Sequence, residues 1–125
     1  MNVIGLGLDA TDIPRVAHVF ARFGDRFLRR IFTDGEIAYC MRRRDPLPSL
    51  AGRFAVKEAA MKALGTGRSR GVLWKDIEVV RAGGAPQLRL HGGAARRAAE
   101  MHVATSLVTI THSDALAIAQ VMLLG

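Results

Sequence analysis

The stretch RFAVKEAAMKALGTG, residues Arg53–Gly67, decides how the rest of the sequence is interpreted. Its apolar spacing predicts a helix from about Ser49 to Leu64. We expect this helix to end at Gly65, because glycine readily adopts the left-handed backbone that closes a helix. One apolar stripe is expected along it, formed by Leu50, Phe54, Met61 and Leu64.

Charged residues interrupt this helix in a pattern with two interpretations. Glu58 and Lys62 are four residues apart and so lie one turn from each other. They form either an exposed pair that stabilises the helix or part of a functional site. Small residues on the same face, Ala51, Ala55 and Ala59, leave room for a ligand. Lys57 falls close to the apolar stripe, which is unusual for a cation unless it reaches solvent or meets an anion.

Outside this helix the sequence predicts mostly helices first and strands last. A helix begins at Pro14 with Asp12 as a candidate N-cap and continues to about Ile31, with an interruption near Gly24. Thr33 and Glu36 form a capping box that opens the next helix, through about Arg43. A further helix is expected over residues 94–101, and strands over 3–8, 77–81, 87–91, 106–111 and 115–124. This order favours an α+β fold with N-terminal helices packed on a mainly antiparallel sheet.

Length and composition limit the class of protein. With 125 residues, we expect one domain over residues 1–125. The net charge of +7 favours a polyanionic partner such as a nucleic acid, a phosphorylated ligand or an acidic protein. The single Cys40 excludes an intrachain disulfide and fits a reducing compartment. Neither a signal peptide nor an apolar run of about 18 residues is present, so we expect a cytoplasmic protein without a membrane partner.

The first strand contains a pattern that suggests a nucleotide-binding loop. Gly5, Gly7 and Ala10 match the loose dinucleotide fingerprint G-x-G-x-x-G/A. That fingerprint needs alternating strands and helices, which this chain lacks, and Pro14 places the helix start after Asp12. We therefore do not expect these residues to form a dinucleotide-binding loop.

Several motifs together resemble one enzyme family. The segment from Phe54 through Lys57-Glu58-Ala59 and Lys62 to Gly67 resembles the signature of phosphopantetheinyl transferases of the short, holo-[acyl-carrier-protein] synthase type. So do Gly5-x-Gly7-x-Asp9-x-x-Asp12, the segments 74–79 and 84–88, and Ser106-x-x-x-Ile110-Thr111-His112. These motifs occur in the family's order and cover almost the whole chain. The resemblance implies transfer of 4′-phosphopantetheine from coenzyme A to a carrier-protein serine, on the α+β fold of that family.

The resemblance also implies a metal site. Asp9 and Glu58 match the family's two metal carboxylates, and Lys62 matches a third catalytic position beside the diphosphate. Magnesium, with manganese as a substitute, suits this set because it takes oxygen ligands and needs only one or two carboxylates beside phosphate oxygens and water. The general base stays open between Glu58, a water on the metal and another carboxylate.

Two further groups of residues follow from the same resemblance. The coenzyme A-binding residues are expected to be Arg53, Lys57, Lys62, Gly65, Thr66, Gly67 and His112. The residues that dock an acidic acyl carrier protein are expected to be Arg15, Val19, Arg22, Arg26 and Phe27. Four arginines, Arg15, Arg22, Arg26 and Arg29, fall within a sector of about 60° on an unbroken helix, so we expect them to form a cationic face.

The resemblance to this family also implies a homotrimer with sites between subunits.

The alternative function is that of a small basic nucleic-acid-binding module, which the net charge favours. Against it, aromatic residues make up only 6% of the chain, and Tyr39 and Trp74 do not form a stacking platform. We therefore expect no nucleic-acid partner.

Overall fold

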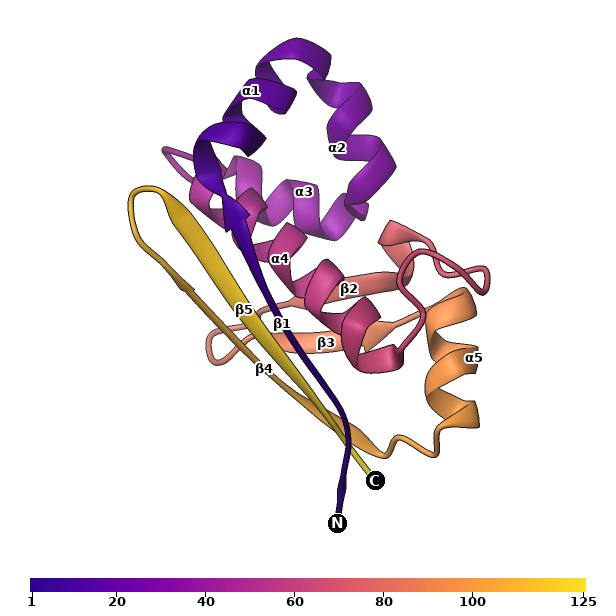
Figure 1. Ribbon diagram of the computed structural model, residues 1–125. Helices are drawn as coiled ribbons and strands as arrows, with labels where there is room; N and C mark the ends of the chain where they lie inside the picture. The colour runs from indigo at the N-terminus through magenta and orange to yellow at the C-terminus, as the bar shows by residue number, and fades with distance from the viewer.

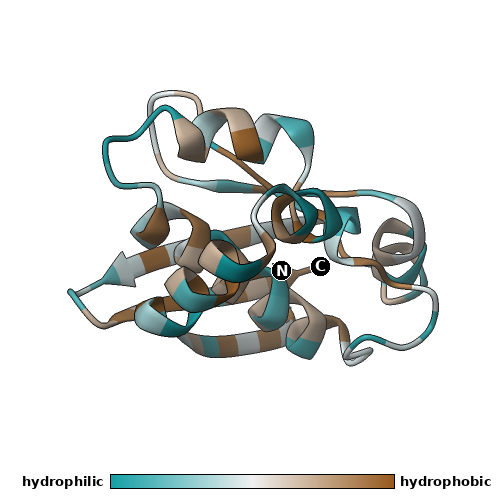
Figure 2. Cartoon of the chain, turned by 90° about the horizontal axis from the view of Figure 1, so that it is seen from above, coloured by the Kyte–Doolittle hydropathy of each residue, from teal (hydrophilic) through white to brown (hydrophobic).

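The computed structural model describes residues 1–125. The larger of its two sheets has three antiparallel strands. The strands are β1 (Val3–Asp12), β4 (Thr105–His112) and β5 (Leu116–Leu124), in the order β1-β5-β4. Bands of contrasting hydropathy alternate along the strands (Figure 2), as expected when successive side chains point to opposite faces. One face of the sheet therefore becomes the floor of the core.

Helix α4 (Leu47–Leu64) lies on this floor and packs mainly on β1 and β5 (Figure 1). Two glycines of β1 make the contact possible. A Cβ on Gly7 would lie 1.8 Å from the carbonyl oxygen of Ala59, and a Cβ on Gly5 would lie 2.2 Å from that of Ala63. The glycines of the apparent nucleotide fingerprint thus allow the backbone of β1 to approach the backbone of α4.

Burial of α4 extends well beyond the single apolar stripe that we expected. Most of its residues are buried, including the small residues Ala51, Ala55 and Ala59. The reason is that other elements surround the helix on the sides that the sheet leaves free. Neighbouring residues occupy the space beside these alanines, so no room for a ligand remains along that face of the helix.

Three short helices gather at one end of α4 (Figure 1): α1 (Ile13–Phe23), α2 (Asp25–Ile31) and α3 (Asp34–Met41). The chain turns between α1 and α2 at Gly24, whose φ of 53° suits glycine. This turn confirms the predicted interruption. The capping box at the start of α3 is also confirmed, because Thr33 Oγ1 accepts from the backbone N–H of Glu36.

The remaining elements pack beside α4. A short 3-10 helix, η1 (Trp74–Asp76), leads into the antiparallel pair β2 (Ile77–Val80) and β3 (Gln87–Leu90). Helix α5 (Gly92–Glu100) then lies at the opposite end of α4 from α1 (Figure 1). The predicted α+β class and every predicted element are confirmed.

The boundaries differ most at β1 and α4. Strand β1 continues four residues beyond the predicted Leu8, because its pairing with β5 extends to Asp12 opposite Leu116. Helix α4 starts two residues before the predicted Ser49, with Pro48 in its first turn, where a missing N–H costs nothing. Asp9 therefore lies inside a paired strand, not after it.

The second face of the three-stranded sheet has no helix on it. Side chains from all three strands leave large apolar groups exposed there: Leu6, Leu8, Leu107, Leu116 and Ile118. They share this face because β1 residues 6 and 8, β5 residues 116 and 118 and β4 residue 107 all alternate with buried neighbours. No helix of the chain is both long and apolar enough to cross a membrane.

Candidate active site

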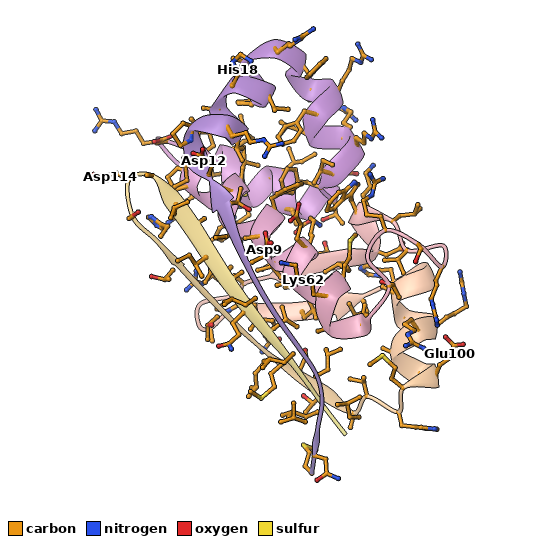
Figure 3. All side chains as sticks on the ribbon, in the orientation of Figure 1. Asp9, Asp12, His18, Lys62, Glu100 and Asp114 are labelled. Atoms are coloured by element: carbon orange, nitrogen blue, oxygen red, sulfur yellow. The ribbon has the colours of Figure 1, made fainter.

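Asp9 of β1 and Glu58 of α4 come together where the strand and the helix touch. The two carboxyl groups are neighbours, since Asp9 is one of the groups that raise the pKa of Glu58. Beside them, Lys62 Nζ donates to Asp9 Oδ1 at 2.9 Å and to the carbonyl oxygen of Leu8 at 3.0 Å. Figure 3 shows Asp9 and Lys62 pointing toward each other from β1 and α4. The structure thus assembles all three expected catalytic side chains at one point.

The surroundings of Glu58 disfavour its charged form. Burial raises the pKa of Glu58, and the hydrogen bond to Asp9 and the charge of Asp9 raise it further. Lys62 and Arg15 oppose this effect only in part. Two neighbouring carboxyl groups, one of them with a raised pKa, present oxygen ligands of the kind that a hard divalent cation binds.

The pair fits a divalent cation that binds through oxygen. No group of three or more His, Cys, Asp or Glu side chains in the chain could hold a metal alone. Magnesium needs only one or two carboxylates when substrate phosphates and water complete its shell. Asp9 and Glu58 provide that number of carboxylates and leave the remaining positions to a ligand.

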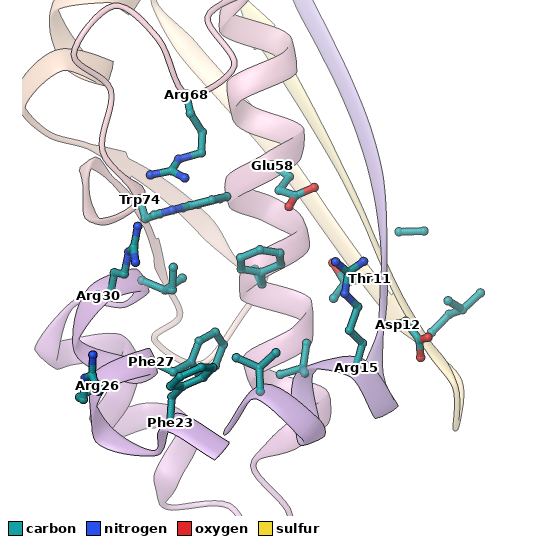
Figure 4. Close-up of a pocket in the computed structure, with 16 residues that line it drawn as sticks. Thr11, Asp12, Arg15, Phe23, Arg26, Phe27, Arg30, Glu58, Arg68 and Trp74 are labelled. Atoms are coloured by element: carbon teal, nitrogen blue, oxygen red, sulfur yellow. The ribbon is translucent and has the colours of Figure 1, made fainter. Parts of the chain in front are cut away.

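A cavity of about 860 Å³ opens beside Glu58. Its floor is apolar and its rim is rich in arginine (Figure 4). The lining comes from β1, α1, α2, α4, the loop after α4, η1 and β5: Ala10, Thr11, Asp12, Arg15, Val16, Val19, Phe23, Arg26, Phe27, Arg30, Ile31, Phe54, Glu58, Arg68, Trp74 and Leu116. The volume is within the range of small-molecule sites.

The expected carrier-docking residues lie on the α1–α2 side of this cavity. Arg15, Val19, Arg26 and Phe27 all line it. Arg22 does not line it; its guanidinium lies 5.2 Å from the ring centroid of Phe23. The cationic face is therefore not a single helical sector. The turn at Gly24, at the predicted interruption, divides it between two helices, so the 60° sector of an unbroken helix does not apply.

The loop after α4 combines a helix cap with a tightly bonded turn. Gly65 ends α4 in the left-handed conformation, with φ of 70°, and Gly67 has φ of 53°. Between them, Thr66 is buried, and its Oγ1 donates to the carbonyl oxygen of Gly67 at 2.9 Å. The predicted C-cap is confirmed. A nucleotide-binding role for Gly65–Gly67 stays a prediction.

The position of Lys57 corrects the expectation that it contacts coenzyme A. Its side chain is 0% exposed, and its ammonium donates to Glu36 Oε1 at 2.7 Å and to the carbonyl oxygens of Trp74 and Ile77. Burial lowers the pKa of Lys57, against the attraction of Glu36. All three donors of the ammonium are used inside the protein, so Lys57 is an internal cation that ties α4 to α3 and to the start of β2.

Arg53 lies one turn before Lys57 and also points away from the cavity. It is 3% exposed, its Nη1 donates to Ser49 Oγ at 2.9 Å, and its guanidinium lies 4.1 Å from the ring centroid of Tyr39. Its Nε has no partner although it is buried. Its neighbours therefore place the Arg53 side chain between α4 and Tyr39 of α3.

His112 is exposed at the end of β4 and does not line the cavity. It pairs with Ala117 of β5, so β5 separates it from β1 and Asp9. The structure therefore does not bring His112 or Arg53, the two predicted phosphate contacts, to Glu58 within one chain.

Sequence reasoning missed a wall of the cavity formed by Arg68, Trp74 and Phe54. The indole of Trp74 stacks on Phe54 with ring centroids 5.0 Å apart, and the guanidinium of Arg68 lies 4.8 Å from the Trp74 centroid. Trp74 lies in a segment that resembles the family, but the sequence suggested no function for it. Arg68 directly follows the glycine loop. A cation next to that loop was the only signal in the sequence.

Comparison with known proteins identifies the family. Residues 5–121 match the model of the 4′-phosphopantetheinyl transferase superfamily. A holo-[acyl-carrier-protein] synthase from Koribacter versatilis is 44% identical over 122 residues, 97% of this chain and 98% of that protein. The match therefore spans almost the whole of both chains.

Solved structures agree with the sequence comparison. A holo-[acyl-carrier-protein] synthase from Neisseria meningitidis superposes with a TM-score of 0.90 at 26% identity, covering 99% of this chain and 100% of that one. One from Helicobacter pylori, in complex with coenzyme A, has a TM-score of 0.83 at 29% identity and covers 94% of this chain and 98% of that one. This chain therefore belongs to the 4′-phosphopantetheinyl transferase superfamily and, within it, to the holo-[acyl-carrier-protein] synthases.

Proposed function

We propose that this chain transfers 4′-phosphopantetheine from coenzyme A to a serine of an apo-acyl carrier protein. The serine Oγ forms a bond to the phosphorus that carries pantetheine. The bond from that phosphorus to the oxygen bridging the two phosphates breaks, and 3′,5′-ADP leaves with that oxygen. The serine proton passes to a base. The observation that carries the proposal is the junction of Asp9, Glu58 and Lys62 in a member of this enzyme family.

Asp9 and Glu58 would hold the magnesium or manganese ion of this reaction. When bound, the cation neutralises charge on the diphosphate. The two carboxylates come from well-supported elements, because β1 is paired with β5 from Gly5 to Asp12 and most of α4 is buried.

Lys62 serves the diphosphate from the same side. Its ammonium is held by Asp9 and the carbonyl of Leu8, yet 56% of the side chain remains exposed. A donor that is oriented but still open to solvent suits the charge that develops on the oxygen of the departing nucleotide. The Gly65–Gly67 loop, one turn beyond, would lie against the nucleotide.

We propose a homotrimer in which each site takes residues from two subunits. The support is the exposed apolar face of the three-stranded sheet, where Leu6, Leu8 and Leu107 each have more than half of their surface exposed. A patch of this kind is typical of a subunit interface. Arg53 and His112, which do not line the cavity of their own chain, would then contact phosphates of coenzyme A in a neighbour's site, His112 near the ribose phosphate.

The α1–α2 side of the cavity would receive the acidic carrier. Arg15, Val19, Arg26 and Phe27 line the cavity together with Glu58, and Arg22 extends the positive charge outside it. Opposite charges on the partners mainly increase the association rate and lose their effect as salt rises. The nucleic-acid-binding alternative is not supported, because the basic side chains surround a cavity that contains the acid pair and the family match is to transferases.

We further propose that residues 1–125 act as one transferase domain and that the reaction takes place in the cytoplasm. The single cysteine, Cys40, is buried, and it fits a reducing compartment.

The decisive experiment is incubation of the purified protein with coenzyme A, magnesium and an apo-acyl carrier protein, followed by mass spectrometry of the carrier. We expect the carrier to gain one phosphopantetheine and 3′,5′-ADP to appear in equal amount. Glu58→Gln, which preserves the shape of the side chain but removes its charge, should stop the gain. A folded wild-type protein that modifies none of several carriers would sink the proposal.

A further inference from the structure

Arg68 stands over the cavity on a support of aromatic rings. Its guanidinium rests on the indole of Trp74, and Trp74 in turn stacks on Phe54 with an angle of 29° between the ring planes. Figure 4 shows Arg68 and Trp74 on one wall, Glu58 beyond the edge of the indole, and Arg15 on the side of α1. Phe54 and Glu58 are one turn apart on α4, so the support and the acid share one rigid helix.

The guanidinium of Arg68 has no anionic partner within the chain. It forms no ion pair and no side-chain hydrogen bond, and neither does Arg15 across the cavity. The cavity as a whole contains four arginines, Arg15, Arg26, Arg30 and Arg68, against two carboxylates, Asp12 and Glu58. It therefore favours an anionic ligand.

Stacking on an indole leaves the donors of the guanidinium free. The ring covers the flat face of the group, whereas its N–H bonds lie in the plane and point outward at the edge. Such an arginine suits a phosphate, which accepts two parallel hydrogen bonds. The loop that carries Arg68 begins with Gly65 and Gly67, both with positive φ angles, and Arg68 itself lines the cavity.

We propose that Arg68 binds the phosphate of coenzyme A that is transferred, the one attached to pantetheine. This assignment rests on the function proposed above. The cavity lined by Arg68 also contains the carrier-docking side chains of α1 and α2, and the phosphate that moves to the carrier must lie in the space that both substrates share. Lys62, by contrast, lies one turn nearer to the glycine loop and serves the nucleotide side.

The test compares Arg68→Gln with Arg70→Gln, a control in the same loop. Arg70 lines a separate cavity of about 350 Å³ with Arg96 and Arg97. Calorimetric titration in magnesium buffer gives the affinity of each variant for coenzyme A and for 3′,5′-ADP, which lacks the pantetheine phosphate. For Arg68→Gln we expect about a 10- to 100-fold loss of affinity for coenzyme A, the effect of one charged hydrogen-bonding partner. Its affinity for 3′,5′-ADP should be unchanged, and Arg70→Gln should resemble the wild type with both ligands.

Transfer kinetics with the same variants complete the test. Arg68→Gln should lower kcat/KM for coenzyme A and leave KM for the carrier unchanged, while Arg68→Lys should recover part of the loss because it keeps the charge without the planar stack. Equal loss of affinity for 3′,5′-ADP, a rise in carrier KM alone, or wild-type affinity for coenzyme A would each overturn the assignment. Absence of transfer by the wild-type protein would overturn the proposed function instead, since the two titrations still decide the role of Arg68.

Discussion

At the scale of single residues, the carboxylate of Glu58 is expected to lower the stability of the metal-free protein while being required for transfer. It lies beside Asp9, and both its burial and this neighbour raise its pKa. In the metal-free protein the folded state therefore binds a proton that the unfolded chain releases, over a pH range above the ordinary value of 4.5. The unfolded chain gives up this proton at lower pH than the folded state does. Rising pH therefore favours the unfolded chain, and the free energy of unfolding falls across this range.

Glu58→Gln should therefore stabilise the metal-free protein while it abolishes transfer. We expect Tm in EDTA to be higher than that of the wild type at about pH 7, and the difference to disappear at about pH 4, where the wild-type acid also holds its proton. Magnesium should raise the Tm of the wild type only. Calorimetric scans with and without magnesium measure both effects, and an equal response of the two proteins to magnesium would contradict the metal assignment.

At the scale of elements, the ion pair of Lys57 and Glu36 joins four segments. Glu36 accepts from the N–H of Thr33 at its own helix start and from the N–H of Val79 in β2, while Lys57 donates to it from α4. The carbonyl oxygens of Trp74 and Ile77 complete the shell of Lys57. Every buried charge here has partners, so removal of one partner leaves the others unsatisfied.

Lys57→Met should lower the free energy of unfolding by about 3 to 5 kcal/mol, because it leaves the carboxylate of Glu36 buried without its cation. Urea denaturation measures the change. The double variant Lys57→Met with Glu36→Gln should recover part of it, because no buried charge remains. If coenzyme A affinity fell in a Lys57→Met protein that is still folded at the assay temperature, Lys57 would have a ligand-binding role after all.

The carrier-docking prediction also belongs to the elements α1 and α2. Arg22 is exposed and lies outside the cavity, so its reversal changes the docking charge without touching the acid pair. Arg22→Glu should raise KM for the carrier several-fold at low salt, less at high salt, and leave KM for coenzyme A unchanged. Arg96→Glu on α5 carries the same change in net charge at the other end of α4 and is the matched control. An equal effect of the two reversals would argue against docking on α1.

Sequence patterns predicted the elements well because helices and strands follow local rules. The Thr33–Glu36 capping box and the Gly65 cap are two examples. The site was predicted in part. Asp9, Glu58 and Lys62 come together as expected, but Lys57 does not, because its partner Glu36 is far along the chain and already had a role as a capping residue. The Arg68–Trp74 contact depends on the path of a loop, and no periodicity encodes such a path.

At the scale of the whole molecule, the bare sheet face is the strongest sign of assembly. Leu8 is 58% exposed near the middle of β1, beside the Asp9 position of the site. An isolated chain with this face would present a continuous apolar surface to water, and association removes it. The predicted trimer thus has a physical reason in the monomer.

Leu8→Glu should convert the proposed trimer to monomers, because it places a charge in the proposed interface. Sedimentation velocity measures the state, and circular dichroism checks that the fold is kept. Transfer should fall with the loss of trimer, since the proposed site needs Arg53 and His112 of a neighbour. Met41→Glu, at the exposed end of α3, is the control and should sediment as the wild type. A monomeric wild-type protein with full activity would refute the shared site.

The contact of Gly7 with Ala59 has a consequence for how such an enzyme can evolve. Main chain meets main chain there, so the spacing of the two acids is fixed without help from the side chains that recognise the carrier. Substitutions on α1 and α2 can redraw partner preference while the chemistry keeps its alignment. We therefore expect substitutions in α1 and α2 to change carrier preference more readily than the spacing of Asp9 and Glu58.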